Sequence, residues 1–168
     1  LSDREIVEDR EMKLLTIVLS AIAGIMLMAA CTSLDCSIDN VVAMNVAVPD
    51  TVKSDTLSVY TIVNGADTAL YTNGVAVTAL SLPMSYGSDA DSYIFAFTPE
   101  DGSTVADTVT VAKTNTPHFE SVDCSPQFWH EIQSVTTTHN VIDSIIINST
   151  HVNNDQTIQH LILRLHSH

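Results

Sequence analysis

The chain has 168 residues, with 20 acidic and 6 basic side chains and a formal net charge of −14. Proteins that bind nucleic acid need lysine and arginine to contact phosphates, so this composition excludes that class of partner. The same charge disfavours attraction to anionic lipid headgroups, so any attachment to a membrane has to depend on an interaction other than electrostatic attraction.

Residues 1–11 carry five acids and two bases, which is not how a secretory signal begins. We interpret them as an upstream segment that is not part of the true protein, with Met12 as its start. No part of the fold is expected from them.

Residues 12–30 have the features of a lipoprotein signal peptide. Lys13 supplies a positive charge, the next 17 residues carry no charge, and two alanines precede Cys31. This arrangement resembles the bacterial lipobox, in which the cysteine is acylated and becomes the first residue of the mature protein. Met28 departs from that pattern, which prefers leucine there. The alternative is an uncleaved membrane helix, although such a helix needs roughly 20 apolar residues.

Cleavage would leave residues 31–168, a length typical of one domain with its own core. Fifteen acidic residues remain in this part, and its only basic residues are Lys53, Lys113 and Arg164. If Cys31 carries lipid, Cys36 and Cys124 are left as an even pair, and an oxidising compartment favours a disulfide between them. Two buried free thiols are the alternative. A cysteine metal site is poorly supported, because the chain has no C-x-x-C motif.

The first half of this domain predicts short strands, because it is rich in Val, Ile and Thr and shows no helical period. Strands are predicted at 41–48, 57–63, 69–72 and 75–80. Asn64-Gly65 and Asn73-Gly74 are predicted as tight turns between them, since both central residues of such turns need positive φ. Leu82-Pro83-Met84 is expected at a sheet edge, because proline cannot donate to a ladder.

The second half predicts a long hairpin and three further strands. Apolar residues alternate from Tyr93 to Phe97 and from Val105 to Val111, and the turn Pro99–Gly102 separates the two arms. The other predicted elements are strands at 118–124, 141–148 and 158–165, a short helical turn at 127–132 after Pro126, and a turn at 152–155. The predicted fold class is all-β: a single antiparallel β-sandwich domain of about eight short strands, preceded by the helical signal peptide.

Catalytic and metal-binding motifs are missing from the sequence. The seven histidines show neither H-x-x-x-H nor H-E-x-x-H spacing, and no G-x-S-x-G nucleophile motif occurs. We therefore expect no enzyme, no cofactor and no metal, with the histidines on the surface or in turns. Asp89 and Asp91 near Gly87 offer oxygens of the kind that calcium prefers, but no EF-hand pattern surrounds them.

Trp129 is the only tryptophan and follows Cys124 closely. We interpret it as an aromatic residue of the core, packed near the predicted disulfide. The alternative is a stacking platform for a sugar or a peptide.

A tripeptide of Asp, then Ser or Thr, then an apolar residue occurs five times. It looks like the O-glycosylation acceptor of Bacteroidota envelope proteins, in which the hydroxyl residue carries the glycan. The candidate acceptors are Thr51, Thr56, Thr68, Thr108 and Ser144. The alternative is structural, because an aspartate in a turn followed by Thr and an aliphatic residue is also how a strand begins.

Several features together resemble a family of small Bacteroidota outer-membrane lipoproteins that is known only as a domain of unknown function. They are the lipobox, Cys36, Leu82-Pro83, the hairpin with Asp107, Cys124 and the strand Ile142-Asp143-Ser144-Ile145. The resemblance implies no activity and no catalytic residue. It implies an outer-membrane location, beside a membrane β-barrel. Residues 32–35 hold a single acid, which favours the periplasmic face, since surface-exported lipoproteins usually carry an acidic run there.

These observations predict an exported lipoprotein that is a non-enzymatic accessory or interaction module. Its lipid would hold it to the membrane, and a sheet face or edge strand would meet a membrane-protein partner. The alternative is a ligand-binding module for calcium or a glycan.

Overall fold

The computed structural model describes residues 12–13, 15–17, 41–50, 55–63 and 65–166. Residues 12–13 and 15–17 are helical, and within the described residues no helix has the length and apolar character needed to cross a membrane. The strands are β1 (Ala43–Ala47), β2 (Thr56–Val63), β3 (Ala66–Val75), β4 (Ala79–Pro83), β5 (Ala90–Thr98), β6 (Val105–His118), β7 (Gln127–Thr137), β8 (Ile142–Ile147), β9 (His151–Val152) and β10 (Leu161–Leu165).

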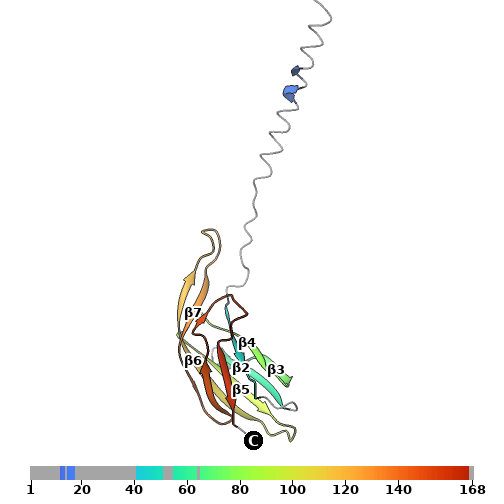
Figure 1. Cartoon of the computed structure of the whole chain (residues 1–168), viewed down its shortest axis with the longest axis vertical. Coiled ribbons are helices and arrows are strands. Elements are labelled where there is room, and N and C mark those ends of the chain that lie inside the picture. The colour runs from blue at the N-terminus through green and yellow to red at the C-terminus, as the bar shows by residue number, and fades with distance from the viewer. Residues whose placement is uncertain (1–11, 14, 18–40, 51–54, 64, 167–168) are drawn as a thin grey trace, which may run out of the picture. The chain divides into compact units, whose positions relative to one another are not determined.

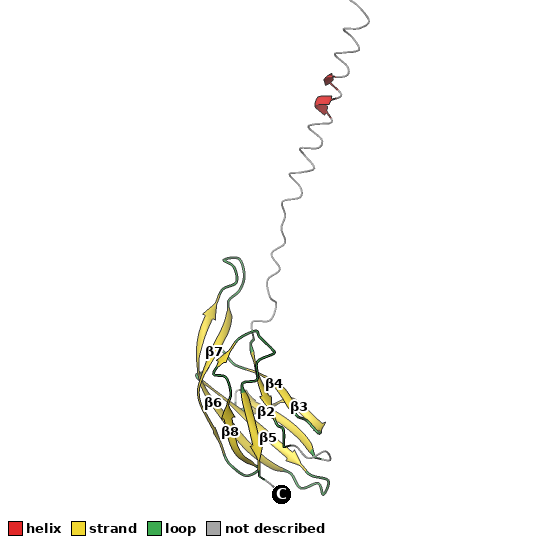
Figure 2. Ribbon diagram, viewed as in Figure 1, coloured by secondary structure: helices red, strands yellow, loops and turns green. Residues whose placement is uncertain are grey.

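The strands form two sheets that pack face to face (Figure 1; Figure 2). One sheet has four strands in the order β4-β1-β10-β8, and the other has six in the order β3-β2-β5-β6-β7-β9. The predicted all-β sandwich is confirmed, with ten described strands in place of about eight. β1 and β10 pair in parallel, with Val46 opposite Leu161, whereas an entirely antiparallel fold was predicted.

The predicted hairpin is β5 and β6. Tyr93 lies opposite Val109, and Phe97 lies opposite Val105, as the alternating pattern indicates. The Gly102 amide donates to the Pro99 carbonyl at 3.0 Å, and Gly102 has a φ of 79°. Glycine adopts this left-handed conformation without steric cost, so it ends the turn.

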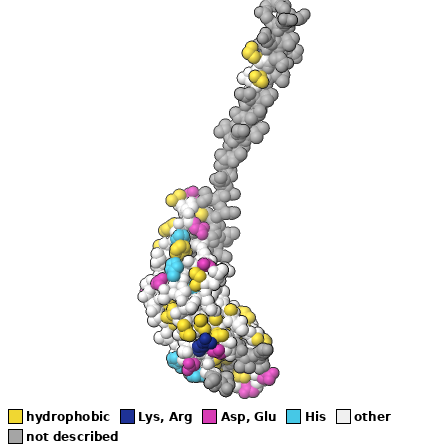
Figure 3. Space-filling view, viewed as in Figure 1, with side chains coloured by type: hydrophobic (Ala, Val, Ile, Leu, Met, Phe, Trp, Pro, Cys, Tyr) yellow, Lys and Arg dark blue, Asp and Glu magenta, His cyan; other side chains and the backbone are white. Residues whose placement is uncertain are grey.

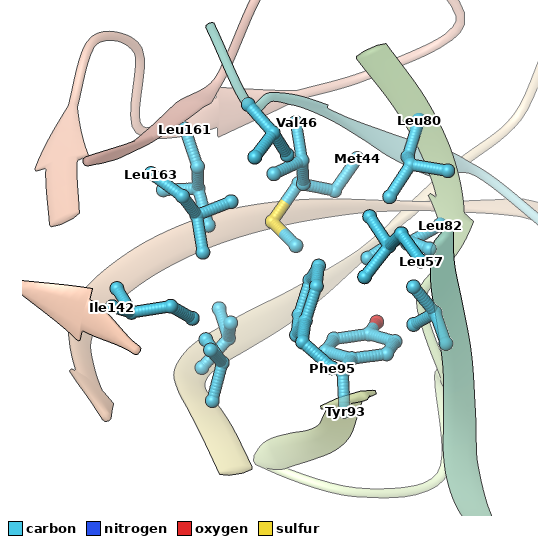
Figure 4. Packing of buried hydrophobic residues seen from close by; sticks show 14 of the residues in the cluster. Met44, Val46, Leu57, Leu80, Leu82, Tyr93, Phe95, Ile142, Leu161 and Leu163 are labelled. Carbon is cyan, nitrogen blue, oxygen red and sulfur yellow. The ribbon is translucent and has the colours of Figure 1, made fainter. Parts of the chain in front are cut away.

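The core lies between the sheets (Figure 4). The four-stranded sheet contributes Met44, Leu82 and Leu163, all at most 1 % exposed, and Tyr93 and Phe95 face them from the six-stranded sheet. In each strand these residues alternate with more exposed ones, so one face of each sheet is apolar. Burial of that apolar area is the main source of the stability of the fold.

Three local predictions are wrong. A strand was predicted at 118–124, but residues 119–126 form the loop between β6 and β7, in which the Cys124 amide donates to the Ser121 carbonyl and closes a turn. Asn73-Gly74 does not turn the chain, because β3 continues through it to Val75 with a bulge opposite β2. Asn73 has a φ of 52°, so the conformation expected of a turn is used in the bulge. Residues 127–132 are not helical but form the start of β7, since the ladder with β6 satisfies their backbone groups.

Candidate functional site

A buried polar cluster surrounds Lys113, whose side chain is fully buried. Its Nζ donates to the carbonyl of Ser85, to the Ser88 carbonyl at 2.7 Å and to Asn115 Oδ1 at 2.8 Å. Asp91 Oδ2 lies 3.5 Å from the same Nζ and accepts a hydrogen bond from the Ser85 amide at 3.0 Å. The ammonium is therefore enclosed by four oxygens. Two are carbonyls of the loop between β4 and β5, and the other two belong to side chains, Asp91 and Asn115, that hydrogen-bond to the same loop.

Burial is the main cause that lowers the pKa of Lys113, and the attraction of Asp91 opposes it. Burial, followed by the charge of Lys113, lowers the pKa of His130 to about 4. His130 is thus neutral near pH 7, and its Nδ1 lies 2.7 Å from Asn115 Oδ1. Because that oxygen is an acceptor, Nδ1 is the protonated nitrogen of the ring.

This cluster includes the segment with Asp89 and Asp91, whose oxygens are of the kind that calcium prefers. The Ser88 carbonyl and the Asp91 carboxylate face the Lys113 ammonium, and Asp89 also attracts it. A lysine ammonium at this point supplies the positive charge that a bound cation would otherwise bring. Among the described residues, no three of the His, Cys, Asp and Glu side chains converge in a way that would hold a metal ion.

Asp107 closes a second buried cluster, at the crossing from one sheet to the other. Its two carboxylate oxygens accept four hydrogen bonds of 2.5 to 2.7 Å. The donors are the Thr138 hydroxyl and the backbone amides of Asn140, Val141 and Ile142. Burial acts to raise the pKa of Asp107, but these hydrogen bonds outweigh it and lower the pKa. The carboxylate therefore organises the turn from β7 to β8.

Trp129 is half-buried, and two histidine rings contact it. The His118 ring stacks on it with centroids 3.7 Å apart, and the His151 ring meets it edge-on at 5.5 Å. His151 also lies 3.3 Å from the Glu131 carboxylate. Trp129 packs against the border of the core, and the His118 ring covers one face of the indole.

Two histidines are buried, contrary to the expectation that all lie on the surface or in turns. His130 is 2 % exposed, and His160 is fully buried. Sequence alternation places His130 in phase with the buried Ile132, which is a signal that the prediction missed.

The candidate glycosylation acceptors fall in different surroundings. Thr68 and Ser144 are exposed, on β3 and β8, whereas Thr56 and Thr108 are half-buried. Thr51 lies outside the described residues. Asp107, which precedes Thr108, is a buried residue inside β6 with a structural role, whereas the alternative reading expected such an aspartate in a turn.

Cys31 and Cys36 also lie outside the described residues, so lipidation and the disulfide with Cys124 stay predictions. Cys124 lies in the loop between β6 and β7, where its amide approaches the Ser121 carbonyl at 3.3 Å. The structure therefore places one of the two predicted partners, half-buried, in the loop between β6 and β7.

The sheets end in four edge strands that no other described strand covers. Three are short: β4 has 5 residues and includes Pro83, β8 has 6 and β9 has 2. β3 is the exception, with 10 residues, eight of them exposed and none of them Lys, Arg or Pro. Natural edge strands are usually short, charged or interrupted by proline. β3 carries a single charge, Asp67 near its start, and its bulge, so the rest of its length is an unprotected edge.

A family of unknown function, DUF6452, matches residues 56–165. The chain belongs to the DUF6452 family. The match covers every described strand except β1, which lies in the interior of the four-stranded sheet between β4 and β10. No curated protein and no solved structure matches the chain. The Lys113 and Asp107 clusters and the β3 edge all lie within the part that defines the DUF6452 family.

Proposed function

We propose that this protein is an exported outer-membrane lipoprotein of the Bacteroidota type, acylated at Cys31, that acts as a non-enzymatic interaction module. It would sit on the periplasmic face and offer the edge of β3 to a strand of a membrane β-barrel protein. The observation that carries the proposal is the long, unprotected β3 edge on a domain whose preceding sequence resembles a lipoprotein signal.

The backbone of β3 supports this proposal. β3 pairs with β2 on one side, and no described strand pairs with its other side. Unpaired amides and carbonyls on such an edge bind an extended strand of a partner through main-chain hydrogen bonds. Tyr71 is 40 % exposed and Val75 is 62 % exposed, so both can add apolar contacts to that pairing.

The polar clusters support a binding role more than a catalytic one. Lys113 is enclosed by protein oxygens, and Asp107 is saturated with hydrogen bonds. A catalytic acid or base needs an open side toward its substrate, which neither group has. Both clusters instead fasten loops that join the two sheets, which is a structural role.

Photo-crosslinking in native membranes tests the proposal. A photoreactive residue at Tyr71 should crosslink to one membrane β-barrel protein, identified by mass spectrometry. The same residue at Ile147, which is equally exposed at 39 % on the β8 edge, should not. Ala69→Lys on β3 should abolish the crosslink, whereas Ser144→Lys on β8 should preserve it. Equal crosslinking from both edges, or no β-barrel product, would contradict the proposal.

A further inference from the structure

The loop between β6 and β7 forms a projecting tip with exposed apolar side chains. β6 ends at His118, which pairs with Gln127 at the start of β7, and residues 119–126 connect the two strands. Figure 1 and Figure 2 both show this hairpin extending past the rest of the sandwich. Phe119 is 61 % exposed, and Val122, at 97 %, is the most exposed large apolar side chain of the described residues.

The tip lies at the end of the domain where β1 begins. The Met84 amide donates to the Val42 carbonyl at 3.0 Å, so the β4–β5 loop starts beside the start of β1. The same loop contacts the hairpin, because Tyr86 stacks on Phe128 with centroids 4.9 Å apart. The Asn115 amide group also donates to the Tyr86 carbonyl at 3.3 Å. From Asn115 the two strands continue outward for about 10 Å before the loop begins.

We propose that this tip inserts Phe119 and Val122 into the surface of a zwitterionic bilayer, so that the lipid-anchored sandwich is oriented with this end toward the membrane. The inference rests on acylation at Cys31, which belongs to the proposed function. Val41 lies ten positions after Cys31 in the sequence. Even fully extended, this segment spans at most about 35 Å, so the end of the domain that holds Val41 stays close to the bilayer.

Chain length and charge together favour a bilayer surface as the occupant. An acyl anchor keeps the tip at a high effective concentration near lipid, so a weak apolar contact is enough to set the orientation. Glu120 and Asp123 are exposed in the same loop and stay in water, which limits the tip to a shallow position. They also disfavour anionic lipid. Figure 3 shows acidic side chains beside apolar ones at this end of the described domain.

Fluorescence quenching tests the orientation on the acylated full chain, purified from membranes and reconstituted into phosphatidylcholine vesicles. The single Trp129 is first replaced by Phe. An indole is then placed at the tip by Phe119→Trp or, as a second probe, by Val122→Trp. The matched control is Val105→Trp, because Val105 is 43 % exposed and lies beside the opposite turn at Gly102. Lipids brominated near the headgroup quench an indole that enters the bilayer surface.

The tip indoles should lose most of their fluorescence, and the indole at position 105 should lose little. Added anionic lipid should weaken the quenching at the tip. Equal quenching at both ends, or none at either tip position while the protein floats with the vesicles, would overturn the orientation. A protein that does not float and carries no acyl group at Cys31 would overturn the proposed function, which is a separate readout.

Discussion

Asn45 and His160 join β1 to the start of β10 by a reciprocal pair of hydrogen bonds. The Asn45 amide donates to His160 Nδ1 at 2.9 Å, and the His160 amide donates to the Asn45 carbonyl at 2.9 Å. The Asn45 side chain adds hydrogen bonds to the carbonyls of Gln156 and Ile158. These two residues thus hold the parallel pairing between the first strand and the last.

Replacing His160 should show how much this pair contributes to stability. His160→Ala removes the ring and its acceptor, and His160→Asn removes most of the ring but restores an acceptor near Nδ1. We expect His160→Asn to be more stable than His160→Ala by about 1 kcal/mol, because the part-buried Asn45 amide keeps a partner. Denaturant unfolding measures the difference. Equal unfolding free energies would show that the hydrogen bond contributes nothing.

Acidification should weaken the fold between about pH 6.5 and 4. Burial is the main cause that lowers the pKa of His160, and it lowers the pKa of His130 to about 4 from an ordinary value of 6.5. Below pH 6.5 the unfolded chain therefore binds protons that the folded chain excludes, so the free energy of unfolding falls as the pH falls. Urea unfolding at a series of pH values checks this. Replacing His130 by Phe should flatten the dependence, and stability that is constant or rises on acidification would contradict the account.

Lys113 should be far more important to stability than the exposed Arg164. Lys113→Met leaves Asp91 and three other oxygens without their buried positive partner, which costs about 3–5 kcal/mol. Arg164→Met breaks an ion pair with Asp50 whose two side chains are 45 % and 38 % exposed, so we expect a loss of at most about 1 kcal/mol. Thermal unfolding of both variants measures the contrast. Similar losses would mean that the Lys113 cluster does not fasten the β4–β5 loop.

Asp107→Asn should destabilise the turn from β7 to β8. An amide at this position retains one acceptor oxygen and turns a donor group toward backbone amides, which costs about 2–3 kcal/mol. Asp143→Asn is the control, because Asp143 also precedes a Ser or Thr but its side chain is 58 % exposed. Hydrogen exchange should show faster exchange at Ile142 only in Asp107→Asn. If the two variants behave alike, the four hydrogen bonds of Asp107 are not what holds the turn.

Alternating apolar residues and turn residues correctly predicted the strands and turns that depend mainly on neighbouring residues in the sequence. The alternation of Tyr93, Phe95 and Phe97 predicted the β5 face, and Gly102 predicted its turn. The prediction of a helical turn at 127–132 was wrong. It rested on the local signal of Pro126, whereas these residues pair with β6, a strand that a local pattern does not identify as their partner. The parallel pairing of β1 with β10 joins residues 115 positions apart, and no local pattern encodes it.

The polar clusters could be predicted only in part. Lys113 continues the inward phase of Val109 and Val111, so the alternation indicates a buried lysine. Its partners in the β4–β5 loop come from a segment whose irregular path depends on packing, so the sequence could not name them. Likewise, Asp107 follows the inward phase of β6, but the amides that it binds belong to a turn more than thirty residues later.

The central claim, acylation of Cys31 on an exported interaction module, is tested most directly by mass spectrometry of the protein purified from membranes. We predict an N-terminal peptide that begins at Cys31 and carries a diacylglycerol thioether, with Cys36 and Cys124 joined in a disulfide under non-reducing conditions. A mature protein that retains the uncharged segment after Lys13, with an unmodified thiol at Cys31, would contradict the account.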